Sequence, residues 1–302
     1  MSVLGGEMID TYRGYVNPWE CDEMGHMNVQ FYMGKTSDAA FHQQAFLGLG
    51  YQHQQTKRTT YVALEHHIRF HKELFASDLV AVRSGTLSLD TKTMRIYQEV
   101  RNALTDTLSA TLVVDVGHFD LNARKLVPWT DFMRGQAEKI MVARPDAAQP
   151  RSQPDGSLDR DASLERAETK GMHETNRSVV NRWECDANDH MNSRFYLARF
   201  SECQGHMWAA AGLDRHSQKA KGLATATVEM RLAYFKELNA GQTLFVRTGL
   251  EAQDAKTLRY RHWMFDAETG QAAAACEGTA LLISRETRKT VDLPSEIRDR
   301  LG

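Results

Sequence analysis

The sequence predicts an α+β protein in which one unit, a long helix followed by antiparallel strands, occurs twice. Two observations lead to this prediction. The stretch WECDEMGHMNVQFY at 19–32 returns as WECDANDHMNSRFY at 183–196, and ten of sixteen residues are identical between 17–32 and 181–196. After each copy, helix-forming residues give way to segments with the alternation of half-buried strands. A helix packed on an antiparallel sheet is an α+β arrangement.

The repeat keeps an offset of 164 residues without a gap. It aligns Asp22 with Asp186, His26 with His190 and Lys72-Glu73-Leu74 with Lys236-Glu237-Leu238. A constant register of this length indicates two copies of one fold. We therefore expect domains at 1–142 and 174–302, joined by a linker at 143–173 that holds three of the six prolines.

Within each copy, the first predicted element is a helix of roughly 18 to 20 residues that ends near a glycine, Gly48 or Gly212. Residue types that cap helices precede it, namely Asp22 in copy one and Asp186, Asn188 and Asp189 in copy two. Alternation then predicts strands in copy one at 61–74, 79–89, 94–102 and 108–121. A short closing helix is expected within 127–141 and within 293–302.

Composition excludes several classes of protein. The formal charge of -2 argues against nucleic-acid binding, and no run approaches 18 apolar residues, so no membrane partner is expected. The first residues lack the pattern of a secretory signal. Four cysteines without a C-x-x-C pair indicate reduced thiols in a cytoplasmic protein.

The motif D-x-x-x-H-M-N before a long helix, followed by antiparallel strands, resembles the hotdog-fold thioesterases, in which the sheet wraps the helix. The resemblance covers 10–142 and 174–302 and implies a tandem double hotdog. Copy two, with Asn188, is similar to the D-x-N-x-H segment of acyl-ACP thioesterases, and Glu237 matches their further acid. Copy one has Met24 instead and looks more like acyl-CoA thioesterases. Its PWECDEMGHMN is also similar to the thioesterase part fused to some carnitine dehydrogenases.

The resemblance implies hydrolysis of an acyl-CoA thioester, with acyl-ACP as the less favoured substrate, at sites where two hotdog units meet and without a metal or redox cofactor. An aspartate would act as general base or nucleophile, and N–H groups around Gly25-His26 and Asp189-His190 would polarise the carbonyl. Acyl-CoA is the expected partner, and pairing through sheet edges would give a homo-oligomer. The predicted catalytic residues are Asp22, His26, Glu73, Asp186, Asn188, His190 and Glu237. The predicted substrate-binding residues are Gly25, Asn28, Asp189, Asn192, Trp19 and Trp183.

Simpler roles compete with these. The aspartates could be helix caps, the histidines structural, the glutamates surface ion-pair partners and the tryptophans core residues. Cys21 and Cys185 could pair with a histidine as nucleophiles, but an adjacent aspartate raises a thiol pKa. A metal site at Glu65, His67 and His71 would lose two ligands in copy two.

Two other functions stay open. A hotdog hydratase or dehydratase is disfavoured, because the N-P-x-H type of motif is absent: Trp19 follows Asn17-Pro18. A non-catalytic acyl-CoA-binding protein is disfavoured, because both copies keep the aspartate and the histidine.

Overall fold

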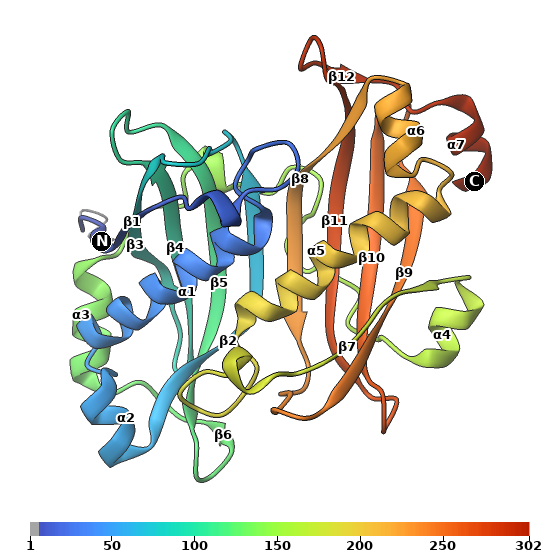
Figure 1. The fold of residues 1–302 in the computed structure, drawn as a ribbon. Helices are drawn as coiled ribbons and strands as arrows, with labels where there is room; N and C mark the ends of the chain where they lie inside the picture. Colours follow the sequence, from blue (N-terminus) through green and yellow to red (C-terminus); the bar gives the residue numbers. More distant parts are fainter. Residues whose placement is uncertain (1–5, 302) are drawn as a thin grey trace. The chain divides into compact units, whose positions relative to one another are not determined.

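The computed structural model describes residues 6–301, and the chain divides into two compact units, Met1–Gln149 and Pro150–Gly302. Each unit contains one long helix that packs on an antiparallel sheet (Figure 1). The predicted α+β fold with two repeats is confirmed.

The first unit forms a five-stranded sheet of order β1-β3-β4-β5-β2, with the short strand β6 on β5. Helix α1 packs against β1, β3 and β4. In chain order its elements are β1 (Ile9–Tyr15), the 3₁₀ turn η1 (Pro18–Glu20), α1 (Val29–Phe46), α2 (Tyr51–Lys57), β2 (Thr59–Phe70), β3 (Leu79–Leu89), β4 (Thr93–Asn102), β5 (Leu108–Asp120), β6 (Lys125–Leu126), α3 (Asp131–Lys139) and η2 (Asp146–Ala148).

The second unit repeats this topology with the order β7-β9-β10-β11-β8, with β12 on β11. Helix α5 packs against β7 and β9. In chain order its elements are α4 (Leu164–Thr169), β7 (His173–Val179), η3 (Arg182–Glu184), α5 (Ser193–Ala210), α6 (Arg215–Ala220), β8 (Leu223–Tyr234), β9 (Thr243–Ala252), β10 (Thr257–Asp266), β11 (Ala272–Ser284), β12 (Thr290–Val291) and α7 (Ser295–Leu301).

The long helices begin at a different residue than the capping pattern suggested. The N-caps are Asn28 and Asn192, whose side chains accept hydrogen bonds from the second residue of each helix. Asp22 and Asp186 lie six residues earlier and cap neither helix. Both helices stop where expected, because Gly48 and Gly212 adopt the left-handed conformation (φ +86° and +82°) that follows a helix end.

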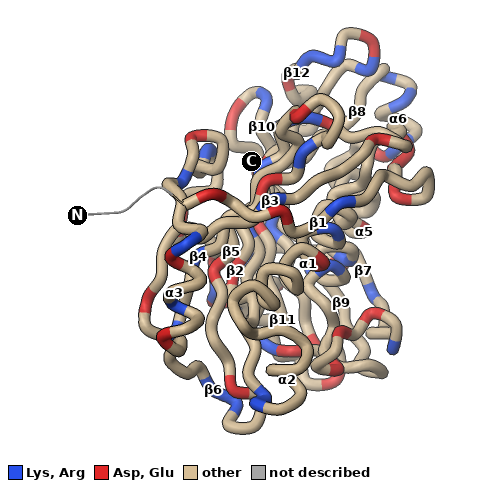
Figure 2. The backbone as a smooth tube through the Cα atoms, turned by 90° about the vertical axis from the view of Figure 1, so that its left-hand side faces the viewer, with Lys and Arg blue, Asp and Glu red and all other residues tan. Residues whose placement is uncertain are grey.

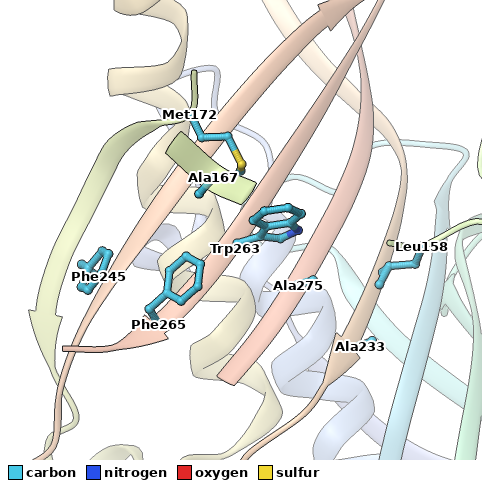
Figure 3. Close-up of a cluster of buried hydrophobic side chains, with 8 residues drawn as sticks. All are labelled: Leu158, Ala167, Met172, Ala233, Phe245, Trp263, Phe265 and Ala275. Carbon is cyan, nitrogen blue, oxygen red and sulfur yellow. The ribbon is translucent and has the colours of Figure 1, made fainter. Parts of the chain in front are cut away.

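The segment after residue 150 packs on the second sheet. Leu158, Ala167 and Met172 belong to a buried cluster that also includes Trp263 and Phe265 of β10 (Figure 3). Hydrophobic burial therefore fixes part of the segment that the sequence suggested as a linker, including the short helix α4.

Charged residues of both signs are interspersed along the chain (Figure 2). No helix within residues 6–301 is long and apolar enough to cross a membrane.

Candidate active site

In copy one, the residues between η1 and α1 form a tight turn closed by Asp22. One carboxylate oxygen, Oδ1, accepts hydrogen bonds from the N–H of Met24 (2.8 Å) and of His26 (3.2 Å). The main chain closes the same turn, with the Asp22 N–H on the His26 carbonyl (2.8 Å) and the Gly25 N–H on the Asp22 carbonyl (3.0 Å). Gly25 sits at φ +81°, a conformation that costs glycine little. Asp22 follows the exposed Trp19 by three residues in the sequence.

Copy two forms the same turn, although all three residues between the aspartate and the histidine differ from those of copy one. Asp186 Oδ1 accepts the Asn188 N–H (2.8 Å), and the His190 N–H also binds this carboxyl. The left-handed position is occupied by Asp189 at φ +61°, where a side chain is strained. Its N–H donates to the Asp186 carbonyl (3.0 Å).

These bonds bear on one part of the expected site. The N–H groups of Gly25 and His26, and those of Asp189 and His190, already donate to the aspartate of their own turn. Each of these expected donors therefore has an acceptor within the turn. The N–H group of the first residue of a helix has no carbonyl acceptor within that helix. In the described part of the chain, the N–H groups of these residues, Val29 and Ser193, have no acceptor.

A histidine and a glutamate meet at each turn. His26 Nδ1 lies 3.4 Å from Glu73 Oε1, and His190 Nε2 lies 3.4 Å from Glu237 Oε2. Main-chain hydrogen bonds hold each histidine beside its glutamate. The Met27 N–H donates to the Leu74 carbonyl, and the Met191 N–H donates to the Leu238 carbonyl, both at 2.7 Å. The structure thus brings aspartate, histidine and glutamate to the start of each long helix.

The residue two positions after each glutamate differs between the copies. Phe75 packs edge-on against the His26 ring, with 5.2 Å between ring centroids. Asn239 instead donates from Nδ2 to the carbonyl of Asp189 (3.2 Å), which holds the strained residue in place.

The carboxylates of Asp22 and Asp186 differ in their exposure to solvent. Asp22 is exposed, whereas Asp186 is half-buried. Desolvation raises the pKa of Asp186 above its ordinary value, against the opposing effects of the Asn188 N–H, the His190 charge and the His190 N–H. The Asp186 carboxylate is therefore a stronger base than that of an ordinary aspartate.

The cysteines beside the aspartates are poor nucleophiles. Burial first, and the neighbouring carboxylate next, raise the pKa of the Cys21 thiol. Burial also raises the pKa of the Cys185 thiol, and Asp186 adds to it. Both thiols are therefore protonated at neutral pH, which argues against thiolate chemistry.

Trp19 and Trp183 are exposed, at 74% and 76% of their full area. They are not core residues, although packing was the simpler expectation for them. Among residues 6–301, no three His, Cys, Asp or Glu side chains are arranged to hold a metal, and Glu65, His67 and His71 form no such group.

Two buried pairs were missed in the sequence: Glu20 with Lys35, and Glu184 with Arg199. The glutamate belongs to the repeated WECD, but nothing marked its basic partner 15 residues later.

The family model of the thioesterase-like superfamily matches residues 16–137 and 180–301, which is most of both units. The chain belongs to this family. The predicted enzyme class, a thioester hydrolase, agrees with this membership.

Individual thioesterases resemble the chain over one copy or over both. A betainyl-CoA thioesterase of Pseudomonas aeruginosa is 31% identical over 123 residues, which cover 41% of this chain and 77% of that protein. The L-carnitine dehydrogenase/betainyl-CoA thioesterase of Rhizobium meliloti is 28% identical over 148 residues, 49% of this chain and 28% of that one. A proposed oleoyl thioesterase of Lactobacillus plantarum has a known structure with a TM-score of 0.71, which covers 93% of this chain and 98% of that chain at 14% identity. This likeness in structure confirms the tandem double hotdog fold.

Proposed function

We propose that this thioesterase-family protein hydrolyses an acyl-CoA thioester to the free acid and CoA, using the turns at Asp22 and Asp186. One observation carries the proposal. In both copies, an aspartate carboxylate and a histidine–glutamate pair meet directly before an 18-residue helix. Thioester hydrolysis needs a carboxylate near the carbonyl carbon and donors near the carbonyl oxygen, and each turn offers both.

The start of the helix supplies the donors. The N–H groups of Val29 and Ser193 lie at the positive end of the helix dipole, where negative charge is stabilised. An oxyanion forms on the carbonyl oxygen in the transition state, and one such donor contributes roughly 2.7–4 kcal/mol there.

The aspartate acts by one of two routes. Its carboxylate attacks the thioester carbon, releases the CoA thiolate and leaves an anhydride that water then opens. Alternatively it removes a proton from a water that attacks the same carbon. General-base catalysis contributes about 10²- to 10⁴-fold in rate. We favour the second turn, because burial raises the pKa of Asp186 and so makes its carboxylate a stronger base, and because Asn188 stands there in place of Met24.

The relatives that act on betainyl-CoA suggest a short acyl group with a quaternary ammonium as the first substrate to test. The exposed faces of Trp19 and Trp183 suit such a group, because a cation over an indole gains about 0.5–2 kcal/mol. We place both tryptophans at the entrance of the site, beside the reactive turns.

Thiol release from betainyl-CoA and from short, medium and long acyl-CoAs tests the proposal. We expect turnover with at least one of them, and a higher KM for the cationic substrate when both tryptophans are replaced by alanine. Tight binding of acyl-CoA without turnover by the wild type would support a binding protein instead. Absence of both would overturn the proposal.

A further inference from the structure

A buried ion pair connects each turn to the second helical turn of the long helix that follows it. In copy one, Lys35 Nζ lies 2.9 Å and 3.0 Å from the two carboxylate oxygens of Glu20. Only 5% of the lysine side chain and 11% of the glutamate side chain are exposed. Glu20 is two residues before Asp22, and Lys35 is in the second turn of α1.

Glu20 also binds the main chain on both sides of the turn. Its Oε2 accepts the N–H of Asn17 (2.8 Å), and its carbonyl accepts the N–H of Asn28 (2.9 Å), the cap of α1. Lys35 donates a third bond to the carbonyl of Tyr15 (3.0 Å), at the end of β1. One pair therefore fixes the strand end, the turn and the helix start relative to each other.

Copy two repeats these contacts with a different base. Arg199 Nη2 lies 2.7 Å and 2.9 Å from the Glu184 oxygens and 3.2 Å from the carbonyl of Val179. Glu184 again accepts the N–H of Asn181 (2.8 Å), and its carbonyl accepts the N–H of Asn192 (2.9 Å). The basic side chain differs, and in copy two Asn181 Nδ2 also donates to Glu184 Oε2 (3.3 Å) while Arg199 Nη1 lies 3.8 Å from Glu202.

The fold does not require an ion pair at every such position. Removing two charges from water costs so much that an apolar pair of similar size is often as stable. The copies show this elsewhere, since Arg261 and Glu277 pair at 2.8 Å in copy two. The residues 164 positions earlier are Tyr97 and Val113, which carry no charge. Stability alone therefore does not explain why both copies have a buried ion pair next to the turn, Glu20–Lys35 in one and Glu184–Arg199 in the other.

We infer that Glu20–Lys35 and Glu184–Arg199 are positioning residues for the reaction. Each pair holds its aspartate at a fixed distance from the first N–H of the helix, so that carboxylate and oxyanion donor reach one carbonyl group together. The glutamate is suited to this, because its side chain fixes the turn and its carbonyl fixes the helix cap. This inference rests on the proposed function, since misplacement by about 1 Å costs up to ~10²-fold in rate.

The test separates the two copies and then removes the charge without removing the side-chain volume. In Asp22→Asn protein, where only the second turn keeps its aspartate, Glu184→Gln is combined with Arg199→Met. In Asp186→Asn protein, Glu20→Gln is combined with Lys35→Met. The control is Arg261→Met with Glu277→Gln, a pair between β10 and β11 in which the glutamate side chain is 2% exposed and the arginine side chain 23% exposed. Arg199→Lys and Lys35→Arg exchange the basic residues that the copies already use.

We expect kcat to fall by at least about tenfold in each neutral-pair variant, with KM changed less than about twofold. The exchange variants should keep kcat within about threefold, and the control should lose thermal stability but not kcat. Should a neutral pair fail to fold, Glu184→Gln with Arg199→Gln, or Glu20→Gln with Lys35→Gln, replaces it with the same expectation, because neither leaves a buried charge without a partner.

Equal kcat in the neutral-pair and parent proteins, or equal loss in the control, would overturn the inference. Both results presuppose turnover by the wild type, so they cannot be confused with failure of the proposed function itself.

Discussion

The turns at Asp22 and Asp186 have the same main-chain hydrogen bonds and different surroundings. The turn at Asp22 has a glycine in the left-handed position, an exposed carboxylate and an apolar ring against its histidine. The turn at Asp186 has a strained aspartate in that position, held by Asn239, and a half-buried carboxylate.

This difference teaches that the backbone geometry of the turn and the environment of its aspartate can change separately. The backbone geometry depends on main-chain hydrogen bonds and on the buried ion pairs, which both copies have. Burial raises the pKa of Asp186, and the exposed Asp22 does not share this burial. We therefore expect the copies to contribute unequally to turnover.

Removal of each aspartate in turn is expected to show the largest difference between the two copies. Asp186→Asn should lower kcat more than Asp22→Asn, and the double variant should lose about 10²- to 10⁴-fold. Thiol release with one acyl-CoA measures all three. Asp292→Asn, at an exposed site outside both turns, is the control. Equal losses from the two single variants would show that burial does not separate the copies.

The oxyanion donors can be removed without a side-chain change in the turn. Proline at the first position of a helix is well tolerated, but it has no N–H. Ser193→Pro should therefore lower kcat by roughly 10²- to 10³-fold in Asp22→Asn protein, with helix content retained.

Circular dichroism would check the fold, and Val29→Pro in the same background is the matched control, because it alters only the other turn. A folded Ser193→Pro variant with unchanged kcat would exclude this N–H as the donor.

Burial of Asp186 should also appear in stability. A raised carboxyl pKa means that the folded state favours the protonated form, so the ionised form costs stability at neutral pH. Asp186→Asn should raise Tm at pH 7. The gain should shrink as the pH falls through the raised pKa and vanish below the ordinary value of 3.8.

Calorimetry between pH 3 and 7 measures this difference. Asp22→Asn, at the exposed counterpart, should change Tm less, because little desolvation is relieved there. A lower Tm for Asp186→Asn at pH 7 would contradict the effect of burial.

The smallest expected effect concerns the left-handed position. Asp189→Gly should relieve backbone strain and stabilise the protein by about 0.5–1 kcal/mol, whereas Gly25→Asp should cost a similar amount. Space is not the limit, since nothing lies within 4 Å of a Cβ built on Gly25. Urea unfolding at pH 7 gives both values, and opposite signs are the decisive result.

Much of the fold could be predicted from the sequence, because the repeat doubled every signal. The 164-residue offset and the alternating segments were enough for two copies of a helix and a sheet. Strand β1 was missed, because only Thr11 of its seven residues is buried. The strand therefore lacks the apolar alternation by which the other strands were predicted.

The site was predicted less completely. Asp22 and Asn28 both belong to capping types, and the choice between them depends on a tertiary bond, from the Asn28 N–H to the Glu20 carbonyl. For the same reason, the N–H groups used inside the turn could not be told from those at the helix start. The exposure of Trp19 also lay beyond the pattern, since a large apolar residue is usually buried.

The packing of Leu158, Ala167 and Met172 against Trp263 and Phe265 has a practical consequence for anyone who dissects the chain. A fragment that starts at residue 174 would lose only the first residue of β7 from the second sheet and yet uncover a hydrophobic patch, so we expect it to aggregate. A fragment that starts at Pro150 carries its own cover. Protease sites or fusion joints belong before Pro150, where the second unit begins.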